Sequence, residues 1–334
     1  MNPPSPTVKP KLLVCALSLV FAAGAAFAQA PKSAEKKDGA AKQPPAPALK
    51  ETIATDIPGV IKGGTKIVLL RDGFKGTEGI IAHPDGSSVI FTEQDADKLI
   101  KVDKNDNITT FLENTNRATG LTYDTKGRLI GAESREPRIA VLAPEPRTVL
   151  ADSFNGQPLV RPNDLIVDKK GGIYFSDPLG APAARFREPP PGRTPLLLYV
   201  TPTGKVVKPT EDVLNPNGIE LTADEKALYV TNGTNIMVYD VQPDGMLKNG
   251  REFCKGGGDG LAIDTEGRLY AAVAGLKAIR VNDKTGKELG LIPVGVPPQS
   301  VGFAGPNKKT LYINGAGALY KAEMIAQGIQ VRAK

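Results

Sequence analysis

The sequence predicts an all-β fold, a six-bladed β-propeller closed by an N-terminal strand. Two observations carry this prediction. A sequence repeat of two apolar strands around a turn rich in Asp, Gly, Pro and Asn occurs six times. One more strand, Thr65–Arg71, precedes the first copy. An oxygen-bearing residue stands at the head of every copy: Glu78, Thr119, Asn163, Asn217, Asp259 and Ser300.

The copies recur at a regular interval. Their head residues are 41, 44, 54, 42 and 41 residues apart along the chain. A period near 40 built from short strands is typical of propeller blades. A solenoid and a sandwich are the alternatives, and the regular period with a spare strand disfavours both. Helical periodicity is confined to a stretch around Glu323–Gln327. We therefore expect Thr65–Arg71 to be the outer strand of the sixth blade, which removes a free edge.

The N-terminal region has the composition of an export signal. Lys9 and Lys11 precede a 16-residue apolar run, Leu12–Phe27, and small residues surround its end. This pattern is typical of a cleaved signal peptide, and the run is shorter than the about 20 residues that span a bilayer. A retained anchor is the alternative. We predict a periplasmic or secreted protein without stable membrane insertion after cleavage, divided into a signal peptide 1–28, a disordered Pro/Ala/Lys-rich tether 29–55 and a propeller 56–334.

Charge and cysteine content exclude several classes of function. The net charge of +6 falls to +4 without Lys9 and Lys11. Residues 30–50 carry five Lys and two acidic residues, so they account for +3 of that +4. The predicted propeller is thus close to neutral, so the composition gives no sign of nucleic-acid binding. Cys254 and His83 are the only Cys and His after residue 28. An internal disulfide and a zinc site of His and Cys are therefore excluded, while nothing in the sequence indicates an oligomeric state.

The propeller geometry predicts where the polar residues of the repeat gather. The first strand of a blade lines the central channel and the second returns antiparallel, so its last residue lies on the same face as the head residue. The loop 178–195, rich in Pro and Arg, leaves from this face and is either a rim of the channel mouth or a surface insertion. The second strands end at Glu93, Glu133, Asp177, Asn232, Val273 and Asn314.

Four head residues form a candidate metal site. Glu78 and Asp259 offer two carboxylates, and Asn163 and Asn217 offer two amide oxygens. Two negative charges balance one divalent cation, and ligation by oxygen alone suits Ca²⁺, Mg²⁺ or Mn²⁺, with Ca²⁺ favoured by its flexible coordination. The alternative is that these residues cap strand ends through hydrogen bonds, as Asn and Asp often do.

Six short motifs, taken in order, resemble the SMP-30/gluconolactonase/LRE-like (regucalcin-like) lactonase family over about residues 68–322. They are Glu78-Gly, Arg117-Ala-Thr-Gly-Leu, Arg161-Pro-Asn-Asp, Tyr174-Phe-Ser-Asp-Pro, Asn215-Pro-Asn-Gly-Ile and Asp259-Gly-Leu-Ala. The resemblance implies a six-bladed propeller with one central divalent metal, held here by Glu78, Asn163, Asn217 and Asp259. The family's usual Arg-x-Asn-Gly substrate pattern is replaced by Arg117-Ala-Thr119-Gly, and its Glu-His pair by Glu133-Ser134.

The function that follows is the metal-dependent hydrolysis of a small lactone, a sugar lactone or a related cyclic ester. The cofactor is one divalent cation, expected to be Ca²⁺, with Mg²⁺, Mn²⁺ and Zn²⁺ as other options. Asp259 is the predicted general base for the attacking water. The predicted substrate contacts are Arg117, Thr119, Glu133 and Asp177, of which Asp177 has a structural role as its alternative.

Two other functions remain open at the level of sequence. One is a non-catalytic propeller of the cell envelope that binds a ligand or a protein, with a structural metal. Because fold alone does not set function, the scaffold supports this reading as well. The other is a quinone-dependent sugar dehydrogenase, which the absence of Trp and the scarcity of His disfavour.

Overall fold

The computed structural model describes residues 50–179 and 188–334. Two compact units divide the chain, Met1–Pro47 and Ala48–Lys334, and the second unit is the one described here. The predicted signal peptide 1–28 and most of the predicted tether lie outside the described residues, as does 180–187 in the loop 178–195. Across the described ranges, no helix has the length and apolar character that a bilayer crossing requires.

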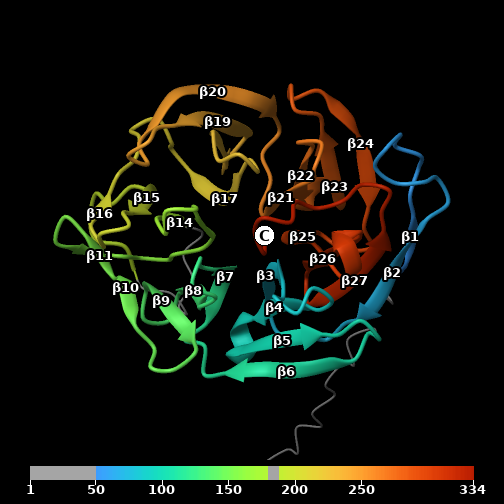
Figure 1. Cartoon of the computed structure of the whole chain (residues 1–334), viewed down its shortest axis with the longest axis horizontal. Coiled ribbons are helices and arrows are strands. Elements are labelled where there is room, and N and C mark those ends of the chain that lie inside the picture. The colour runs from blue at the N-terminus through green and yellow to red at the C-terminus, as the bar shows by residue number, and fades with distance from the viewer. Residues whose placement is uncertain (1–49, 180–187) are drawn as a thin grey trace, which may run out of the picture. The chain divides into compact units, whose positions relative to one another are not determined.

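The strands form six sheets around one axis (Figure 1). The first blade holds β3 (Thr77–Ala82), β4 (Val89–Glu93), β5 (Lys98–Val102) and β6 (Ile108–Glu113). The second holds β7 (Ala118–Tyr123), β8 (Leu129–Glu133), β9 (Arg138–Ala143) and β10 (Val149–Ala151). The third holds β13 (Leu165–Val167), β14 (Ile173–Asp177), β15 (Leu196–Val200) and β16 (Val206–Val207).

The remaining three blades follow the same plan. The fourth holds β17 (Pro216–Leu221), β18 (Ala227–Asn232), β19 (Asn235–Val241) and β20 (Leu247–Lys255). The fifth holds β21 (Leu261–Ile263), β22 (Leu269–Val273), β23 (Ala278–Asn282) and β24 (Glu288–Pro293). The sixth holds β25 (Ser300–Ala304), β26 (Thr310–Gly315) and β27 (Ala318–Glu323), joined by β2 (Lys66–Arg71) and β1 (Thr52–Ile53).

The predicted six-bladed, all-β propeller is confirmed, and so is its closing strand. β2 pairs antiparallel with β27, with Val68 opposite Lys321 and Leu69 opposite Tyr320. The first strands of the blades contact one another in a closed cycle, from β3 through β7, β13, β17, β21 and β25 back to β3. β1 extends the sixth sheet a few residues before the start expected at residue 56.

The core lies between neighbouring blades, and strand periodicity explains how it forms. Successive side chains of a strand point to opposite faces of its sheet. In β14, Ile173 and Phe175 therefore pack against the second blade, whereas Tyr174 packs against the fourth. All five residues of β14 are buried. Strands that are covered on both faces read as continuous apolar runs, as those of this chain do.

Three features differ from or add to the sequence prediction. No helix occupies Glu323–Gln327, since β27 ends at Glu323 and an irregular segment follows. A two-stranded hairpin of β11 (Ser153–Phe154) and β12 (Gln157–Pro158), which the sequence did not indicate, lies between the second and third blades. Short 3₁₀ turns occur at η1 (Gln94–Ala96), η2 (Ala274–Leu276) and η3 (Pro306–Lys308).

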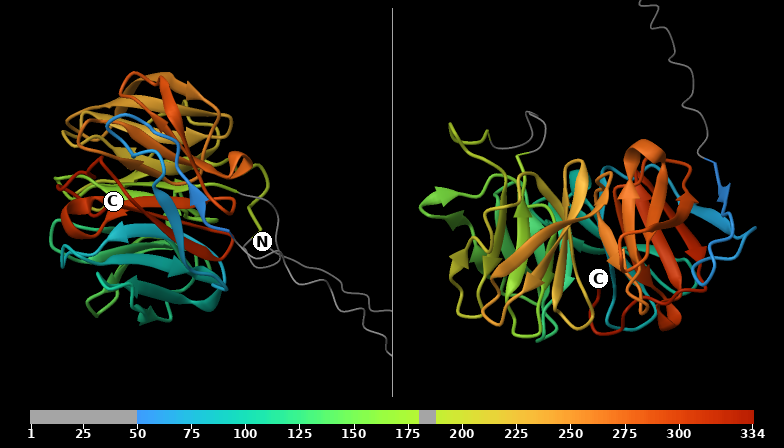
Figure 2. Two further views of the ribbon diagram at one scale, coloured as in Figure 1. Left: turned by 90° about the vertical axis from the view of Figure 1, so that its right-hand side faces the viewer. Right: turned by 90° about the horizontal axis from the view of Figure 1, so that it is seen from above.

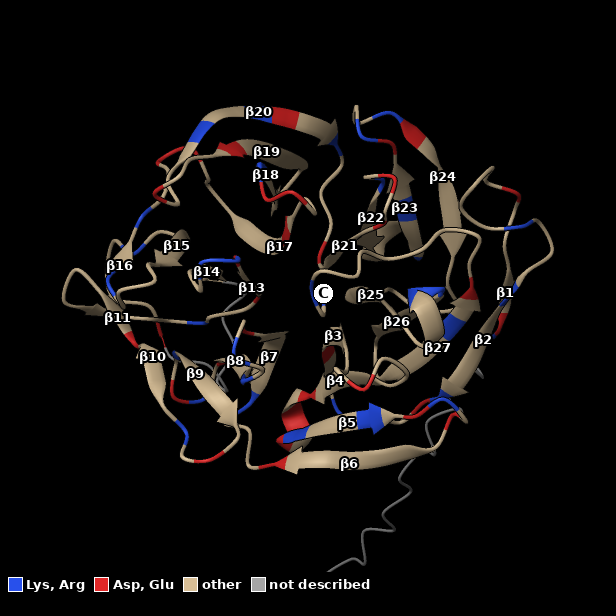
Figure 3. Cartoon of the chain, viewed as in Figure 1, with Lys and Arg blue, Asp and Glu red and all other residues tan. Residues whose placement is uncertain are grey.

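The two faces of the ring are built differently. Head residues and long connections lie on one face, and the tight turns within the strand pairs lie on the other, where the C-terminal segment crosses the ring (Figure 2). The C-terminal end is thereby brought to the central axis (Figure 1). Charged residues of both signs are spread around the ring, in loops as well as in strands (Figure 3).

Candidate metal centre

The four predicted metal ligands come together at the axis. Glu78 lies on β3 and Asn217 on β17, while Asn163 and Asp259 lie two residues before β13 and β21. All four line one cavity of about 10 Å³, together with glycine and apolar residues of the first strands. That volume is close to what one water-sized sphere needs, so the space suits a single ion.

The two carboxylates among these four residues, Glu78 and Asp259, disfavour each other's ionised form. Burial raises the pKa of Glu78 well above its usual value, and the negative charges of Asp259 and Asp164 raise it further. Burial likewise raises the pKa of Asp259 to about 7, with Asp164 again adding to the effect. Two acidic groups whose ionised forms are disfavoured by desolvation and by each other are what a bound cation would stabilise.

Hydrogen bonds orient the ligands. Gln299 donates from Nε2 to Oε1 of Glu78 at 2.9 Å, and its own side-chain oxygen accepts from the backbone N–H of Ala316 at 3.1 Å. The side chain of Asn217 is hydrogen-bonded to Asp259. Oδ1 of Asn217 is buried and has no hydrogen-bond partner among the described residues. A buried amide oxygen without a donor is costly unless something else satisfies it, and a cation would do so.

The donor set fits a hard divalent ion. Within residues 50–179 and 188–334, no three side chains of His, Cys, Asp or Glu are grouped for metal binding. A metal at the axis would therefore depend on the amide oxygens of Asn163 and Asn217 beside the carboxylates of Glu78 and Asp259. This all-oxygen set is the kind that Ca²⁺ accepts and that soft metals avoid.

Arg117 and Thr119, two of the predicted substrate contacts, lie at the start of the second blade. The guanidinium of Arg117 pairs with Asp95, and its backbone N–H donates to Asp97 at 2.8 Å. Thr119 is 2% exposed, and its hydroxyl lies 3.1 Å from the carbonyl of Ala132 and 3.0 Å from that of Pro162. Its side chain thus joins the second blade to the loop before Asn163 and is directed away from the axial cavity.

The other two predicted substrate contacts, Glu133 and Asp177, are fully buried. Glu133 accepts hydrogen bonds from Asn116 and Arg138, and burial raises its pKa. Asp177 accepts from the backbone N–H of Val160 at 3.1 Å and of Arg161 at 2.6 Å, and it pairs with Arg193. Asp177 therefore anchors the segment that precedes Asn163, which matches the structural alternative for this residue.

Four further residues border the site and received no role from the sequence. Gln299 directly precedes a head residue. Asp164 directly follows one, at a repeat position that is Gly79, Gly120, Gly218 or Gly260 in four other blades, so its departure from that pattern was a usable signal. The charge of Arg161 lowers the pKa of Glu78 and of Asp259, which places it near both. Lys334 lines the cavity from outside the repeats, where no local pattern marks it.

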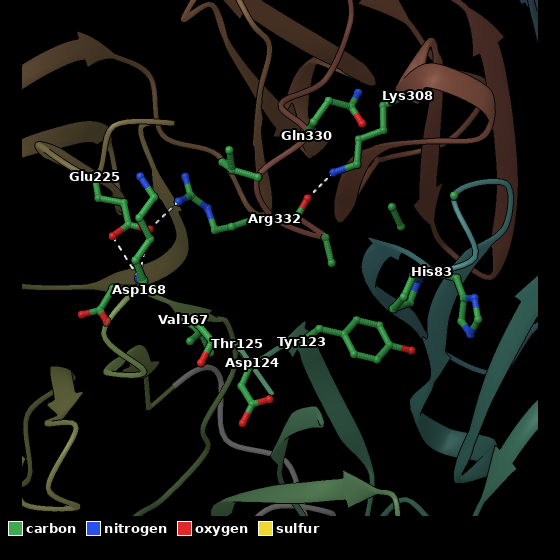
Figure 4. A pocket seen from close by; sticks show the side chains of 16 residues that line it. His83, Tyr123, Asp124, Thr125, Val167, Asp168, Glu225, Lys308, Gln330 and Arg332 are labelled. Atoms are coloured by element: carbon green, nitrogen blue, oxygen red, sulfur yellow. Dashed lines mark hydrogen bonds and ion pairs between the residues drawn. The ribbon is translucent and has the colours of Figure 1, made fainter. Parts of the chain in front are cut away.

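A larger cavity, of about 350 Å³, lies at the turn face (Figure 4). His83, which directly follows β3, lines it, so this histidine lies at the opposite end of that strand from Glu78. Its charged walls are engaged within the chain: Arg332 pairs with Glu225 at 3.0 Å, and Lys308 donates to the carbonyl of Ile329 at 2.7 Å. The smaller axial cavity, with its convergent ligands, is therefore the candidate site.

Comparison with known proteins gives a consistent picture. The profile of the SMP-30/gluconolactonase/LRE-like region matches residues 76–317. A gluconolactonase of Zymomonas mobilis is 26% identical over 299 residues, spanning 76% of this chain and 80% of that one. A gluconolactonase structure from Xanthomonas campestris superposes with a TM-score of 0.73 at 23% identity, over 85% of this chain and 99% of the other. The structure of a calcium-binding protein, regucalcin, from Agrobacterium tumefaciens superposes with a TM-score of 0.65 at 18% identity. The match covers 78% of this chain and 94% of that one.

Proposed function

Because this chain belongs to the SMP-30/gluconolactonase/LRE-like family, we propose that it is a divalent-metal-dependent lactonase. Its substrate would be a small lactone, a sugar lactone or a related cyclic ester, and its products the ring-opened hydroxy acid. The gluconolactonase of Zymomonas mobilis, similar over most of both chains, supports this reaction class. The observation that carries the metal is the axial cavity itself, where four oxygen-bearing side chains converge and one of them, Asn217, has a buried Oδ1 with no hydrogen-bond partner among the described residues.

Glu78, Asn163, Asn217 and Asp259 would hold the ion, and Ca²⁺ suits these ligands best. When bound, such an ion polarises the lactone carbonyl and stabilises the negative charge that develops on its oxygen, a contribution of several kcal/mol. Gln299 restrains Glu78 through its hydrogen bond, and Asn217 restrains Asp259 in the same way. Preorganised ligands of this kind need little rearrangement during the reaction.

Asp259 would act as the general base that takes a proton from the attacking water. A carboxylate has two oxygens, so one can contact an ion while the other accepts a proton. Burial raises the pKa of Asp259 to about 7. A bound cation would lower this pKa again, so the carboxylate would be ionised and able to accept a proton at neutral pH. Arg161, whose positive charge acts on Asp259 and Glu78, favours their ionised forms.

We also assign this enzyme to the periplasm or the extracellular space, on the strength of the export-type composition of residues 1–28. Arg117, Glu133 and Asp177 would act mainly by holding the chain around the site in place, since each is already paired within the chain. The substrate would be a small molecule.

The test is lactone hydrolysis by the purified protein before and after metal removal. We expect EDTA to abolish the opening of D-glucono-1,5-lactone or another lactone of a panel, and Ca²⁺ or Mn²⁺ to restore it. Asp259→Asn should lower kcat by about 10²–10⁴-fold, the usual contribution of a general base. Asp244→Asn, at an exposed turn far from the axis, is the matched control and should keep wild-type rates.

Two results would contradict this proposal. Failure to open any lactone with Ca²⁺, Mn²⁺ and Zn²⁺ supplied would refute the hydrolase. If Ca²⁺ still raised the melting temperature in that case, the metal would be structural and the non-catalytic binding protein would be the better description. Full activity of Asp259→Asn would instead remove Asp259 from the role of base.

A further inference from the structure

Asp164 brings a third carboxylate to the axial cavity. It lines the cavity together with Glu78 and Asp259, and it stands where four other blades have the glycine that follows the head residue. Its side chain reaches the fourth blade, where Oδ2 accepts from the backbone N–H of Ile219 at 2.8 Å. The negative charge of Asp164 is felt by both Glu78 and Asp259. Asp164 is thus not grouped with Glu78 and Asp259 as a third ligand, but it adds negative charge beside them.

Lys334 supplies the compensating charge. Its ammonium pairs with Oδ2 of Asp164 and donates to the carbonyl of Ile219 at 2.6 Å. The pair is nearly sealed from solvent, with 6% of the Lys334 side chain and 12% of the Asp164 side chain exposed. Lys334 thus links Asp164, which follows Asn163, to Ile219, which lies two residues after Asn217. Both asparagines are candidate ligands.

The segment that carries Lys334 is held firmly in place. Residues 324–334 cross the turn face of the ring after β27. The backbone N–H of Ala82 donates to the carbonyl of Ala333 at 2.8 Å, and Arg332 pairs with Glu225 and donates to the carbonyl of Leu221 at 2.6 Å. Lys308 donates to the carbonyls of Ile329 and Arg332. Contacts to the first, fourth and sixth blades therefore fix the position of Lys334, so its charge is a constant feature of the site.

We propose that Lys334 is a built-in counter-ion of the metal centre, which offsets the charge of Asp164 and so reduces the negative charge that Glu78, Asp259 and Asp164 together present to a divalent cation. It is a positioning residue that acts through Asp164 and has no contact with substrate. The inference rests on the proposed metal-dependent function. A buried carboxylate that loses its cation is strongly unfavourable. Without Lys334, a bound divalent ion would compensate more of the charge of Asp164.

The direction of the effect separates this role from a purely structural one. Removing a structural lysine lowers stability and leaves metal affinity equal or weaker. Removing a counter-ion makes the cavity more negative, so a divalent cation binds more tightly. For charges a few ångströms apart in a partly buried site, the change is on the order of tenfold in Kd. Arg161, whose charge also acts on Glu78 and Asp259, is unchanged in every variant.

The experiment is calorimetric titration of the full chain with Ca²⁺. We expect Lys334→Met to bind Ca²⁺ on the order of tenfold more tightly than wild type, and Asp164→Asn to bind it more weakly by a similar factor. The double variant should return close to the wild-type Kd, because the two charges compensate each other. Lys334→Arg keeps the charge and should keep the affinity. Circular dichroism and melting temperature report whether each variant is folded.

Lys321→Met is the matched control. Lys321 pairs with Asp106 at 2.7 Å on the outer part of the ring, so this variant loses the same charge and an ion pair at a distance from the axis. Its Ca²⁺ affinity should equal that of wild type. An equal gain in Lys321→Met and Lys334→Met would show a general effect of net charge and would overturn the proposal.

Other outcomes separate a failure of the counter-ion role from a failure of the proposed function. If wild type binds Ca²⁺ and opens lactones but Lys334→Met binds Ca²⁺ equally or less tightly, the counter-ion role is wrong and the proposed function stands. If wild type binds no Ca²⁺, Mg²⁺ or Mn²⁺, both the metal-dependent function and the counter-ion role fall. Should Lys334→Met fail to fold, Asp164→Asn decides alone, and an affinity equal to or above wild type overturns the role.

Discussion

At the scale of single residues, the glycine after the head residue explains how the ring can close around so small a site. A methyl group on Gly79 would overlap the carbonyl oxygen of Thr119 in the next blade, and one on Gly218 would overlap that of Asp259. Gly260 is less crowded, with the nearest carbonyl, that of Gln299, at 3.1 Å from an added methyl. In these blades, the polar head residue is therefore followed by a glycine, whose lack of a side chain lets the backbone of the next blade's head residue come close.

Gly218→Ala is predicted to damage both the fold and the site. The added methyl must displace the backbone of Asp259, and overpacking of this kind costs about 1–3 kcal/mol or more. We expect urea unfolding to show that loss, and calorimetry to show weaker Ca²⁺ binding, because Asp259 is a candidate ligand. Gly275→Ala is the control, since a methyl there meets nothing within 4 Å. Wild-type stability of Gly218→Ala would contradict the packing described here.

At the scale of elements, β17 brings three contributions to the site and its surroundings. Asn217 near its start faces the axis, Ile219 contacts Asp164 and Lys334 through its backbone, and Glu220 is buried. Oε1 of Glu220 accepts from the backbone N–H of Leu221 at 3.1 Å, while Oε2 has no hydrogen-bond partner among residues 50–179 and 188–334. A fully buried carboxyl with one unsatisfied oxygen favours its neutral form.

The stability of the ring should fall with rising pH because of Glu220. Burial raises its pKa to about 7 from 4.5, although Lys334 and Arg332 act in the opposite direction. The folded protein therefore binds this proton more tightly than the unfolded chain. The resulting stabilisation is complete below pH 4.5 and is lost as the pH rises through 7.

Glu220→Gln tests this expectation by removing the titration. Relative to wild type, the variant should gain on the order of 3 kcal/mol in free energy of unfolding between pH 4.5 and pH 8. Urea unfolding at several pH values within that range measures the difference. Glu252→Gln, at an exposed position of β20, should follow the wild-type curve. Parallel curves for wild type and Glu220→Gln would refute the prediction.

At the scale of the whole ring, two segments from outside the repeats hold the first and last blades together. β2 adds the outer strand of the sixth blade and buries Ile67 completely. The segment 324–334 ties several blades at the turn face, where Gly328 donates to the carbonyl of Lys308 at 2.9 Å and Thr265 to that of Gln327 at 2.8 Å. A propeller has no free sheet edge only when such closure is complete.

Removing β1 and β2 should therefore abolish cooperative folding. A chain that starts at residue 72 loses Ile67 and the partly buried Leu69 and Leu70 from the core. At about 1.5–3 kcal/mol for each buried side chain, the loss approaches the 5–15 kcal/mol that stabilises a whole domain. A chain that starts at residue 50 keeps these strands and is the control. Size-exclusion chromatography and thermal unfolding compare the two, and a folded monomer lacking β2 would contradict the role of closure.

Much of the fold could be predicted because it is written in a local pattern. Strand periodicity, turn residues and the interval of about 40 residues specify each blade without reference to the others. Equivalent positions of a repeat then lie at equivalent places around the axis. For this reason Glu78, Asn163, Asn217 and Asp259 could be grouped from the sequence, although they span 181 residues of chain from first to last.

The surroundings of the site could not be predicted in the same way. The hydroxyl of Thr119 bonds two carbonyls, and Glu133 and Asp177 are buried with partners from other segments. The repeat indicates where a residue stands, but the direction of its side chain depends on which donors the neighbouring loops bring close. Those loops vary in length and sequence from blade to blade, so no periodic signal marks their contacts.

By itself, therefore, the sequence determined the propeller, its closing strand and the gathering of oxygen-bearing head residues at the axis, because all three follow from strand patterning and repeat equivalence. Only the tertiary structure decided how that ring is completed. Lys334 meets Asp164 across 170 residues, and Gln299 meets Glu78 across 221. Such contacts form when the closed ring brings the C-terminal segment and the sixth blade to the axis, and no stretch of sequence short enough to show a pattern contains both partners.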